Sequence, residues 1–534
     1  MNSKTLDHTR RVQRALDYIE ANVAGHIDIR EASEQAALSP WHFQRVFHEI
    51  IGVPIKHYVR GRRLSLASLD LLYTRKRIID IALEAGFESQ EAFTRAFCAQ
   101  FGMPPSRFRA EQRLAELSAT QFRAVTAYQQ RGDAPADDAI EVLHWWTSGG
   151  EARASAELQR RVEAKGYRWK DVAVPSYAGQ PAMDLLTARA IAGKPPTAAQ
   201  VIGHRIQEWG RAGVLANLDE LAAPGDWDAL LPDPVRDLMQ CGGHYVAAPL
   251  AIHRVNCLWV NLEVFRQAGA HPPTTWEEFF AAAEKLRRAG VVPVNCGDQP
   301  WETALVFQGV ALGVGGADFY RKAFVELDAH ALGSSAMAKS LAVFRRVRQY
   351  AHPSSPGGGW NRTTRMVIEG EAAMQFMGDW ARAEFSVAGR VPGRDYLCLA
   401  VPGSAQAFAF HVDSLVMFSQ CSSRLLPAQS ELCLSVMDAQ LQEAFNLDKG
   451  SIPARRDLSS SRFEREGQRY MDDFVTSLGH RNLVPSWEMA MPGSTRQVFS
   501  EVLSRVWGAS LSPEEAMHAL ASAAKALAQL AVAL

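Results

Sequence analysis

The sequence lacks any apolar run long enough to cross a bilayer, for which a helix needs about 20 consecutive apolar residues. The N-terminal stretch MNSKTLDHTRRVQRALDYIE is charged and has none of the apolar core of an export signal. Low-complexity tracts are also absent. From these absences we expect no membrane insertion and a cytoplasmic location.

Cysteine is scarce and dispersed. The seven cysteines among the 534 residues never stand in a CxxC pair, and their number is odd. Zinc sites and disulfide frameworks need paired or regularly spaced cysteines, so we expect reduced thiols, no metal and no cofactor. The length suits roughly three domains of about 150 residues each.

The charges are unevenly spread. Residues 1–125 carry 18 Lys and Arg against 14 Asp and Glu, whereas the remainder carries 39 against 44. The first segment is therefore modestly basic, which permits a nucleic-acid partner without requiring one.

One stretch of the sequence recurs fifty positions later. Residues 41–54 read WHFQRVFHEIIGVP and residues 91–104 read EAFTRAFCAQFGMP, with Phe, Arg, Phe, Gly and Pro at matched positions. The fixed offset indicates a duplicated unit. Each copy predicts a helix, a turn and an amphipathic helix, with Asp28 and Ser89 as N-caps and Gly86 ending a helix.

The second helix of each pair carries polar side chains as well as the apolar repeat. They are Gln44 and Arg45 in the first copy, and Gln90, Thr94 and Arg95 in the second. An ordinary helical bundle would need only the apolar residues. Because Arg and Gln reach base edges in the major groove, while basic neighbours such as Lys76 hold phosphates, the pattern favours two helix-turn-helix motifs on double-stranded DNA.

Residues 9–110 resemble the AraC/XylS DNA-binding domain through SPWHFQRVF, IDIALEAGFESQEAFTRAF and FGMPPSRFR. The resemblance implies an all-α domain with two recognition helices. Glu91 departs from the neutral amide of close relatives, and a carboxylate prefers a cytosine amino group, so we expect a different second half-site. The DNA contacts implied are Trp41, Gln44 and Arg45 in the first recognition helix and Gln90, Thr94 and Arg95 in the second.

A break in composition follows this domain. Residues 111–124 are expected to form a last helix and VTAYQQRGDAPADDA an exposed linker, so that 111–139 joins two domains. Across 140–534, short apolar runs alternate with long amphipathic helices. This alternation predicts α/β architecture arranged in two lobes.

The second segment contains side chains of the kinds that bind sugars. Aromatic rings cover the C–H faces of a pyranose, and charged groups hydrogen-bond its hydroxyls. Taken singly, each such residue is more commonly a core or solvated side chain. The candidates are Trp145, Trp146, Glu151, Trp301, Asp379, Lys449 and His480.

This segment resembles the family 1 extracellular solute-binding proteins, and among them the glucose- and mannose-binding branch that serves ABC importers. The matching stretches include EVLHWWTSGGEA, IQEWGRAGVLANLDEL, AAMQFMGDWA and NLDKGSIPAR. The resemblance implies a two-lobed, periplasmic-binding-protein-like (type II) fold and assigns sugar contacts to the seven candidates. Ile202 stands where that branch places a Lys or His, which predicts a different sugar or binding weaker by about 1–3 kcal/mol.

The chain is expected to be multi-domain, with an all-α double helix-turn-helix domain followed by a two-lobed α/β sugar-binding domain. This order predicts a sugar-responsive transcription regulator. Its expected partners are promoter DNA, a monosaccharide such as glucose or another aldohexose, a second copy if it forms a homodimer, and RNA polymerase if it activates. One alternative is a carbohydrate-binding component of an ABC sugar importer carrying a fused DNA-binding domain. An enzyme is disfavoured, because a glycosidase needs paired carboxylates flanking the bond and the sequence indicates none.

Overall fold

The computed structural model describes residues 27–51, 76–101 and 139–532, except 175–179, 192–194, 298, 353–359 and 420–424. It also describes single residues and short stretches within 8–22, 54–71 and 104–109. The helix and linker expected over 111–138 lie outside the described residues.

Two helix pairs make up the first part of the chain. They are α2 (Ile29–Gln35) with α3 (Pro40–Ile51), and α5 (Ile78–Glu84) with α6 (Gln90–Phe101). Asp28 accepts a hydrogen bond from the backbone N–H of Arg30 at 2.7 Å, and Ser89 accepts one from Ala92 at 3.1 Å. Gly86 follows α5 with a φ of 75°, in the left-handed region that glycine favours. The predicted caps and helix end are confirmed.

The repeated phenylalanines form the cores of the two pairs. Phe43 and Phe47 of α3, like Phe93 and Phe97 of α6, are completely buried. The two rings of each pair lie 5.6 and 5.4 Å apart between centroids. The sequence repeat is therefore a repeat of core packing, which leaves the other face of each second helix for polar side chains.

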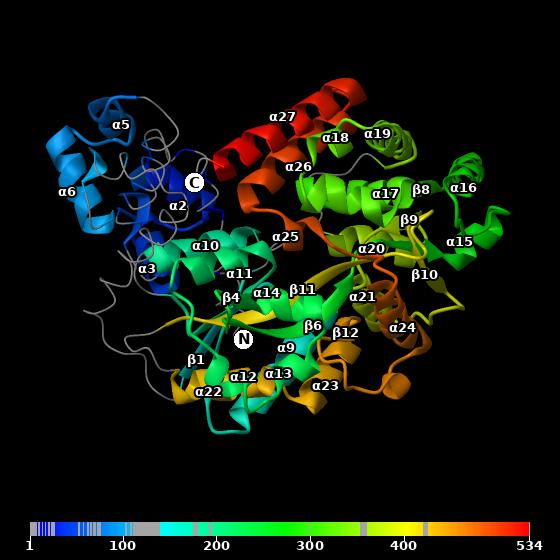
Figure 1. The fold of residues 1–534 in the computed structure, drawn as a ribbon, viewed down its shortest axis with the longest axis horizontal. Coiled ribbons are helices and arrows are strands. Elements are labelled where there is room, and N and C mark those ends of the chain that lie inside the picture. Colours follow the sequence, from blue (N-terminus) through cyan, green and yellow to red (C-terminus); the bar gives the residue numbers. More distant parts are fainter. Residues whose placement is uncertain are drawn as a thin grey trace.

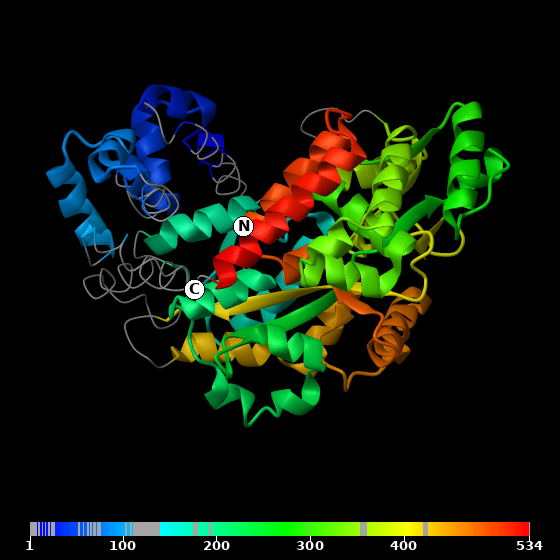
Figure 2. The same cartoon turned by 45° about the horizontal axis from the view of Figure 1, so that its top comes forward.

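The two pairs differ in what surrounds their cores. The residues around Phe93 and Phe97 form a hydrophobic cluster that is separate from the core of the rest of the chain. The core around Phe43 and Phe47 continues into that of the long second part. Helix α3 contacts α10 (Gln180–Ile191), and the two helices lie side by side in Figures 1 and 2.

The long second part forms two lobes (Figure 1). The elements of the first lobe besides α10 are β1 (Ala139–His144), α9 (Gly149–Glu163), β2 (Arg168–Ala173), β3 (Ala198–Val201), α11 (His204–Arg211), α12 (Asp219–Ala222), α13 (Trp227–Leu230), α14 (Asp233–Met239), β4 (Gln240–Cys241), β5 (His244–Tyr245), β6 (Ala247–Arg254), β11 (Phe408–Met417), α22 (Pro427–Val436), α23 (Ala439–Lys449), β12 (Ile452–Pro453) and β13 (Leu483–Pro485). Its seven-stranded sheet has the order β12-β6-β11-β3-β1-β2, with β13 paired to β11. Strand β1 runs parallel to β2 and β3, whereas β11 runs antiparallel to β3 and β6.

The second lobe is built on a four-stranded sheet with the order β10-β7-β9-β8. This lobe and the segments packed on it comprise β7 (Cys257–Asn261), α15 (Leu262–Gln267), α16 (Trp276–Arg288), β8 (Val292–Asn295), α17 (Pro300–Tyr320), the π-helix Arg321–Val325, α18 (Ala329–Leu332), α19 (Ser335–Arg348), α20 (Trp360–Glu369), β9 (Ala372–Phe376), α21 (Ala381–Val387), β10 (Tyr396–Ala400), the 3-10 helix Ser460–Arg462, α24 (Arg465–Gly479), α25 (Trp487–Ala490), α26 (Gly493–Trp507) and α27 (Pro513–Val532). A capping box starts α16, where Thr275 accepts a hydrogen bond from the N–H of Glu278 at 3.2 Å.

The lobes are joined by short segments and also touch directly. Residues 255–256 connect β6 to β7, and residues 401–407 connect β10 to β11. A Cβ atom placed on Gly150 would lie 2.0 Å from the Cβ of Ala383, and one on Gly203 would lie 2.1 Å from the carbonyl oxygen of Glu488. Glycine at both positions therefore allows the two lobes to close against each other.

The predicted architecture, a helical first part followed by a two-lobed α/β fold, is confirmed. Within the described ranges, no helix combines the length and the apolar character needed to span a bilayer.

We predict that Phe93→Ala lowers the free energy of unfolding of the second helix pair by about 3–5 kcal/mol, because it leaves a cavity in a small core. Hydrogen–deuterium exchange should show lost protection in α5 and α6 and unchanged protection in β6 and β9. Phe43→Ala, the matched change in the continuous core, should also reduce protection in α10. Loss of protection throughout the chain after Phe93→Ala would contradict the separation of the two cores.

Candidate functional site

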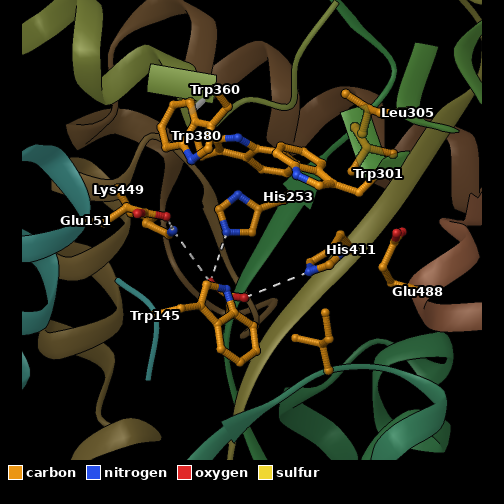
Figure 3. A pocket seen from close by; sticks show the side chains of 13 residues that line it. Trp145, Glu151, His253, Trp301, Leu305, Trp360, Trp380, His411, Lys449 and Glu488 are labelled. Carbon is orange, nitrogen blue, oxygen red and sulfur yellow. Dashed lines mark hydrogen bonds and ion pairs between the residues drawn. The ribbon is translucent and has the colours of Figure 1, made fainter. Parts of the chain in front are cut away.

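A pocket lies between the two lobes. The space between its lining side chains amounts to about 650 Å³, part of which is open to solvent. Figure 3 shows the lining side chains. The connection between β6 and β7 contributes Val255. The first lobe contributes Trp145, Glu151, Ile202, His253, His411, Asp413 and Lys449, and the second contributes Trp301, Leu305, Trp360, Trp380 and Glu488.

A buried ion pair forms one side of the pocket. Glu151 lies in the first turn of α9, where its Oε2 accepts a hydrogen bond from the N–H of Ser148 at 3.3 Å. Its Oε1 accepts a hydrogen bond at 2.6 Å from Nζ of Lys449, the last residue of α23. The carboxylate thus lies at a helix N-terminus and the ammonium group at a helix C-terminus, the positions that the helix dipoles favour.

Asp413 is the centre of the hydrogen-bond network. Its carboxylate accepts hydrogen bonds from Nε1 of Trp146 at 3.0 Å and from Nε2 of Gln200 at 3.0 Å. Nε2 of His253 lies 3.3 Å away and Nζ of Lys449 lies 3.8 Å away. The pairing of β11 with β6 shifts register beside Asp413, and such a bulge changes the direction in which a strand side chain points.

His253 connects Asp413 to the second lobe. Its Nδ1 lies 2.5 Å from Oδ1 of Asp379, which follows β9, and Oδ2 of Asp379 accepts a hydrogen bond from the N–H of Arg254 at 2.7 Å. Burial alone would lower the pKa of His253, but the Asp379 and Asp413 carboxylates outweigh it and raise that pKa to about 9. His253 is therefore protonated at neutral pH and donates from both ring nitrogens.

The pKa values of Lys449, Asp413 and His411 are also shifted by their surroundings. Burial would lower the pKa of Lys449, yet Glu151 and Asp413 outweigh it and raise that pKa. Burial would raise the pKa of Asp413, yet Lys449 and His253 outweigh it and hold that pKa well below its usual range. Burial lowers the pKa of His411, so this imidazole is neutral at neutral pH.

Aromatic rings face the pocket from both lobes. Trp145 lies on the side of the first lobe, and Trp301, Trp360 and Trp380 gather on the opposite side (Figure 3). No group among the described residues accepts a hydrogen bond from Nε1 of Trp301. Indole faces on two sides of a pocket with fixed charged groups suit a ring that has apolar faces and a polar edge, as a pyranose has.

The structure brings four of the seven predicted sugar contacts into the lining, namely Trp145, Glu151, Trp301 and Lys449. Trp146 and Asp379 are fully buried behind it, where they support Asp413 and His253. His480 does not line the pocket: it is exposed at the C-terminal cap of α24. This placement does not support the predicted role of His480.

Six charged or aromatic lining residues were missed by the sequence reasoning. Trp380 directly follows Asp379 in the FMGDW stretch, so its position was accessible from the sequence. A single His or Asp within an otherwise apolar run, as in AAPLAIHR and FAFHVDSLVM, is a second signal in the sequence, because such a group needs a partner if the run is buried. The missed residues are His253, Trp360, Trp380, His411, Asp413 and Glu488.

Most of the predicted DNA contacts are exposed on the second helix of each pair. On α3, Trp41 is 73% exposed, Gln44 and Arg45 are exposed, and the Arg45 guanidinium lies 5.3 Å from the Trp41 ring centroid. On α6, Gln90 and Arg95 are exposed and Thr94 is half-buried. Exposed Lys76 pairs with Glu84, with Nζ and Oε2 2.5 Å apart.

Comparison with known proteins identifies the second part. Residues 148–409 match the model of the bacterial extracellular solute-binding proteins. A probable sugar-binding periplasmic protein of Brucella suis biovar 1 (strain 1330) is 39% identical over 389 residues, which cover 72% of this chain and 92% of that protein. The solved structure of a chitin oligosaccharide binding protein shares the fold with a TM-score of 0.62 and 16% identity, over 74% of this chain and 99% of that one.

The first part has relatives of a different kind. Residues 32–111 match the model of a helix-turn-helix domain. The HTH-type transcriptional activator AarP of Providencia stuartii is 36% identical over 98 residues, which cover 18% of this chain and 73% of that protein. The chain belongs to the bacterial extracellular solute-binding protein family, and its first part is an AraC-type helix-turn-helix domain.

Proposed function

We propose that this chain is a cytoplasmic, sugar-responsive transcription regulator. It binds promoter DNA through α3 and α6 and senses a monosaccharide in the pocket between the lobes. The observation that carries the proposal is the joining of two features in one chain: exposed Arg and Gln side chains on two second helices, and a charged pocket lined by indole rings.

The proposed ligand is glucose or another aldohexose. The lining offers indole faces for a pyranose, and the Glu151–Lys449 pair and Asp413 offer charged groups for its hydroxyls. Ile202 contributes an apolar surface where a polar contact to a hydroxyl would strengthen binding by about 1–3 kcal/mol. We therefore expect modest affinity, which suits a sensor of sugar inside the cell.

The alternative is a carbohydrate-binding component of an ABC importer that carries a fused DNA-binding domain. The Brucella relative is named as a periplasmic protein, which favours this alternative. The contact between α3 and α10 favours the regulator, because it joins the first recognition helix to the first lobe. The two functions differ in whether sugar changes the affinity for DNA.

Sugar binding is tested by calorimetry and tryptophan fluorescence on the full chain. We predict that an aldohexose binds and changes the fluorescence, and that Trp301→Ala reduces its affinity by about tenfold or more because an aromatic face is lost. Trp41→Ala, at the exposed surface of α3, is the matched control and should leave sugar binding unchanged. No heat with common hexoses and disaccharides at millimolar concentration would contradict a sugar pocket.

DNA binding is tested by fluorescence anisotropy, with a duplex selected from a random library and a random duplex for comparison. We predict that Arg45→Ala and Arg95→Ala each weaken binding to the selected duplex by about 1–3 kcal/mol, because each removes a base contact. Lys76→Ala should weaken binding to both duplexes alike, and Trp301→Ala should affect neither. An equal loss on random DNA after the Arg changes would place these side chains on phosphates instead.

Coupling is tested by measuring the affinity for the selected duplex with and without sugar. We predict a several-fold change in either direction, because sugar that binds the closed lobes better shifts the population of states. Gly-Ser repeats inserted within residues 125–139 should reduce the change, because only the contact between α3 and α10 then transmits it, and should leave both separate affinities intact. An unaltered response after the insertion would contradict coupling through the linker, and sugar binding without any effect on DNA would favour the importer component.

A further inference from the structure

One carboxylate of the pocket has no role in the hydrogen-bond network around Asp413. Glu488 lies beside His411, on the side of the pocket away from the Glu151–Lys449 pair (Figure 3). Across the described residues, no group forms a hydrogen bond or an ion pair with this half-buried carboxylate. A half-buried carboxylate without a protein partner is less well hydrated than an exposed one, so it favours a ligand group that neutralises it.

The position of Glu488 is held by the contact between the lobes. Its carbonyl oxygen lies where a side chain on Gly203 would stand, so α25 packs directly against the first lobe there. Ile202, the neighbour of Gly203, lines the pocket with an apolar side chain and offers no polar group. The contact therefore keeps Glu488 at the edge of the pocket.

The two charged bases of the pocket are engaged by other carboxylates. Nζ of Lys449 lies 2.6 Å from Glu151 and 3.8 Å from Asp413. The ring nitrogens of His253 lie 2.5 Å from Asp379 and 3.3 Å from Asp413. Neither Lys449 nor His253 pairs with Glu488 on the opposite side of the pocket.

The pocket consequently has an excess of negative charge. Its lining holds three carboxylates against two protonated bases, and Asp379 behind His253 adds a fourth carboxylate. His411 does not offset the excess, because burial lowers its pKa and leaves it neutral. In a pocket that is only partly open to solvent, such an excess attracts a cationic ligand group.

The indole rings add to this preference. The rings of Trp301 and Trp380 line the pocket, and Trp380 lies 6.3 Å from the ring of His411 between centroids. Indole faces attract cations, and the attraction is strongest where water is excluded. Aromatic faces and an unpaired carboxylate together form a site for an ammonium group attached to an apolar-faced ring.

We propose that the ligand is a sugar bearing a protonated amine, a hexosamine such as glucosamine, with its ammonium group at Glu488. This inference rests on the proposed sugar-binding function and specifies the class of sugar. A neutral hexose binds the same pocket more weakly, because its hydroxyls form hydrogen bonds with Glu488 but bring no opposite charge.

The test is calorimetry on the full chain at neutral pH with glucosamine, glucose and N-acetylglucosamine. We expect glucosamine to bind about tenfold more tightly than glucose, the gain typical of one charge-assisted contact. N-acetylglucosamine, whose nitrogen is uncharged, should show no such gain. Equal affinities for glucosamine and glucose, or an equal gain with the acetylated sugar, would overturn the proposal.

Variants assign the preference to one side chain. Glu488→Gln removes the charge with little change in shape, and the ratio of the glucosamine and glucose affinities should fall close to one. Glu488→Asp should retain part of the ratio. Glu501→Gln, an exposed carboxylate on α26, is the control and should keep the native ratio. A native ratio in Glu488→Gln would overturn the assignment.

The same measurements separate this proposal from the one on which it rests. Failure of all three sugars to bind would contradict the sugar pocket itself. Binding of glucose that is as tight as or tighter than binding of glucosamine would leave the sugar pocket intact and overturn only the preference for an amine.

Discussion

The buried Asp413 carboxylate is the group on which the arrangement of the pocket depends. It accepts hydrogen bonds from Trp146 and Gln200 of the first lobe, and its contact with His253 continues to Asp379 of the second. On the other side, Lys449 extends the network to the start of α9. Removing one partner from such a buried network leaves an uncompensated charge and costs about 3–5 kcal/mol. The network thus holds the lining in one geometry, while the indole rings supply the apolar surface that faces the pocket.

The first recognition helix and the pocket belong to one continuous body. The core of the first helix pair continues into the first lobe through α3 and α10, whereas the second pair has a core of its own. A change in the orientation of the first lobe would therefore move α3 relative to α6. In the proposed mode of binding, both helices fit successive major grooves, so a small change in their spacing would alter the affinity for DNA. The arrangement would then give closure of the lobes a physical route to the proposed DNA-binding face.

Local patterns in the sequence were sufficient for the features that depend on short-range chemistry. The repeat around Phe43 and Phe93 predicted two units of helix, turn and amphipathic helix, and the structure buries the apolar faces of both second helices. Asp28 and Ser89 predicted the starts of two helices, since their side chains satisfy backbone N–H groups within three residues. The alternation of apolar runs and amphipathic helices predicted the two-lobed α/β fold. The same stretches supplied four of the residues that line the pocket, namely Trp145, Glu151, Trp301 and Lys449.

The tertiary structure alone decided which side chains face the pocket. Trp146 and Asp413, which are 267 residues apart in the chain, meet because β1 and β11 belong to one sheet, and this contact turns Trp146 away from the lining. The register shift beside Asp413 directs its carboxylate, and the close approach of the lobes at Gly203 places Glu488 at the edge. The sequence by itself determined the order of helical and α/β parts, the family and four of the side chains that line the pocket. Their final positions depend on strand register and on how two lobes meet, which are properties of contacts between distant segments and leave no local pattern to detect.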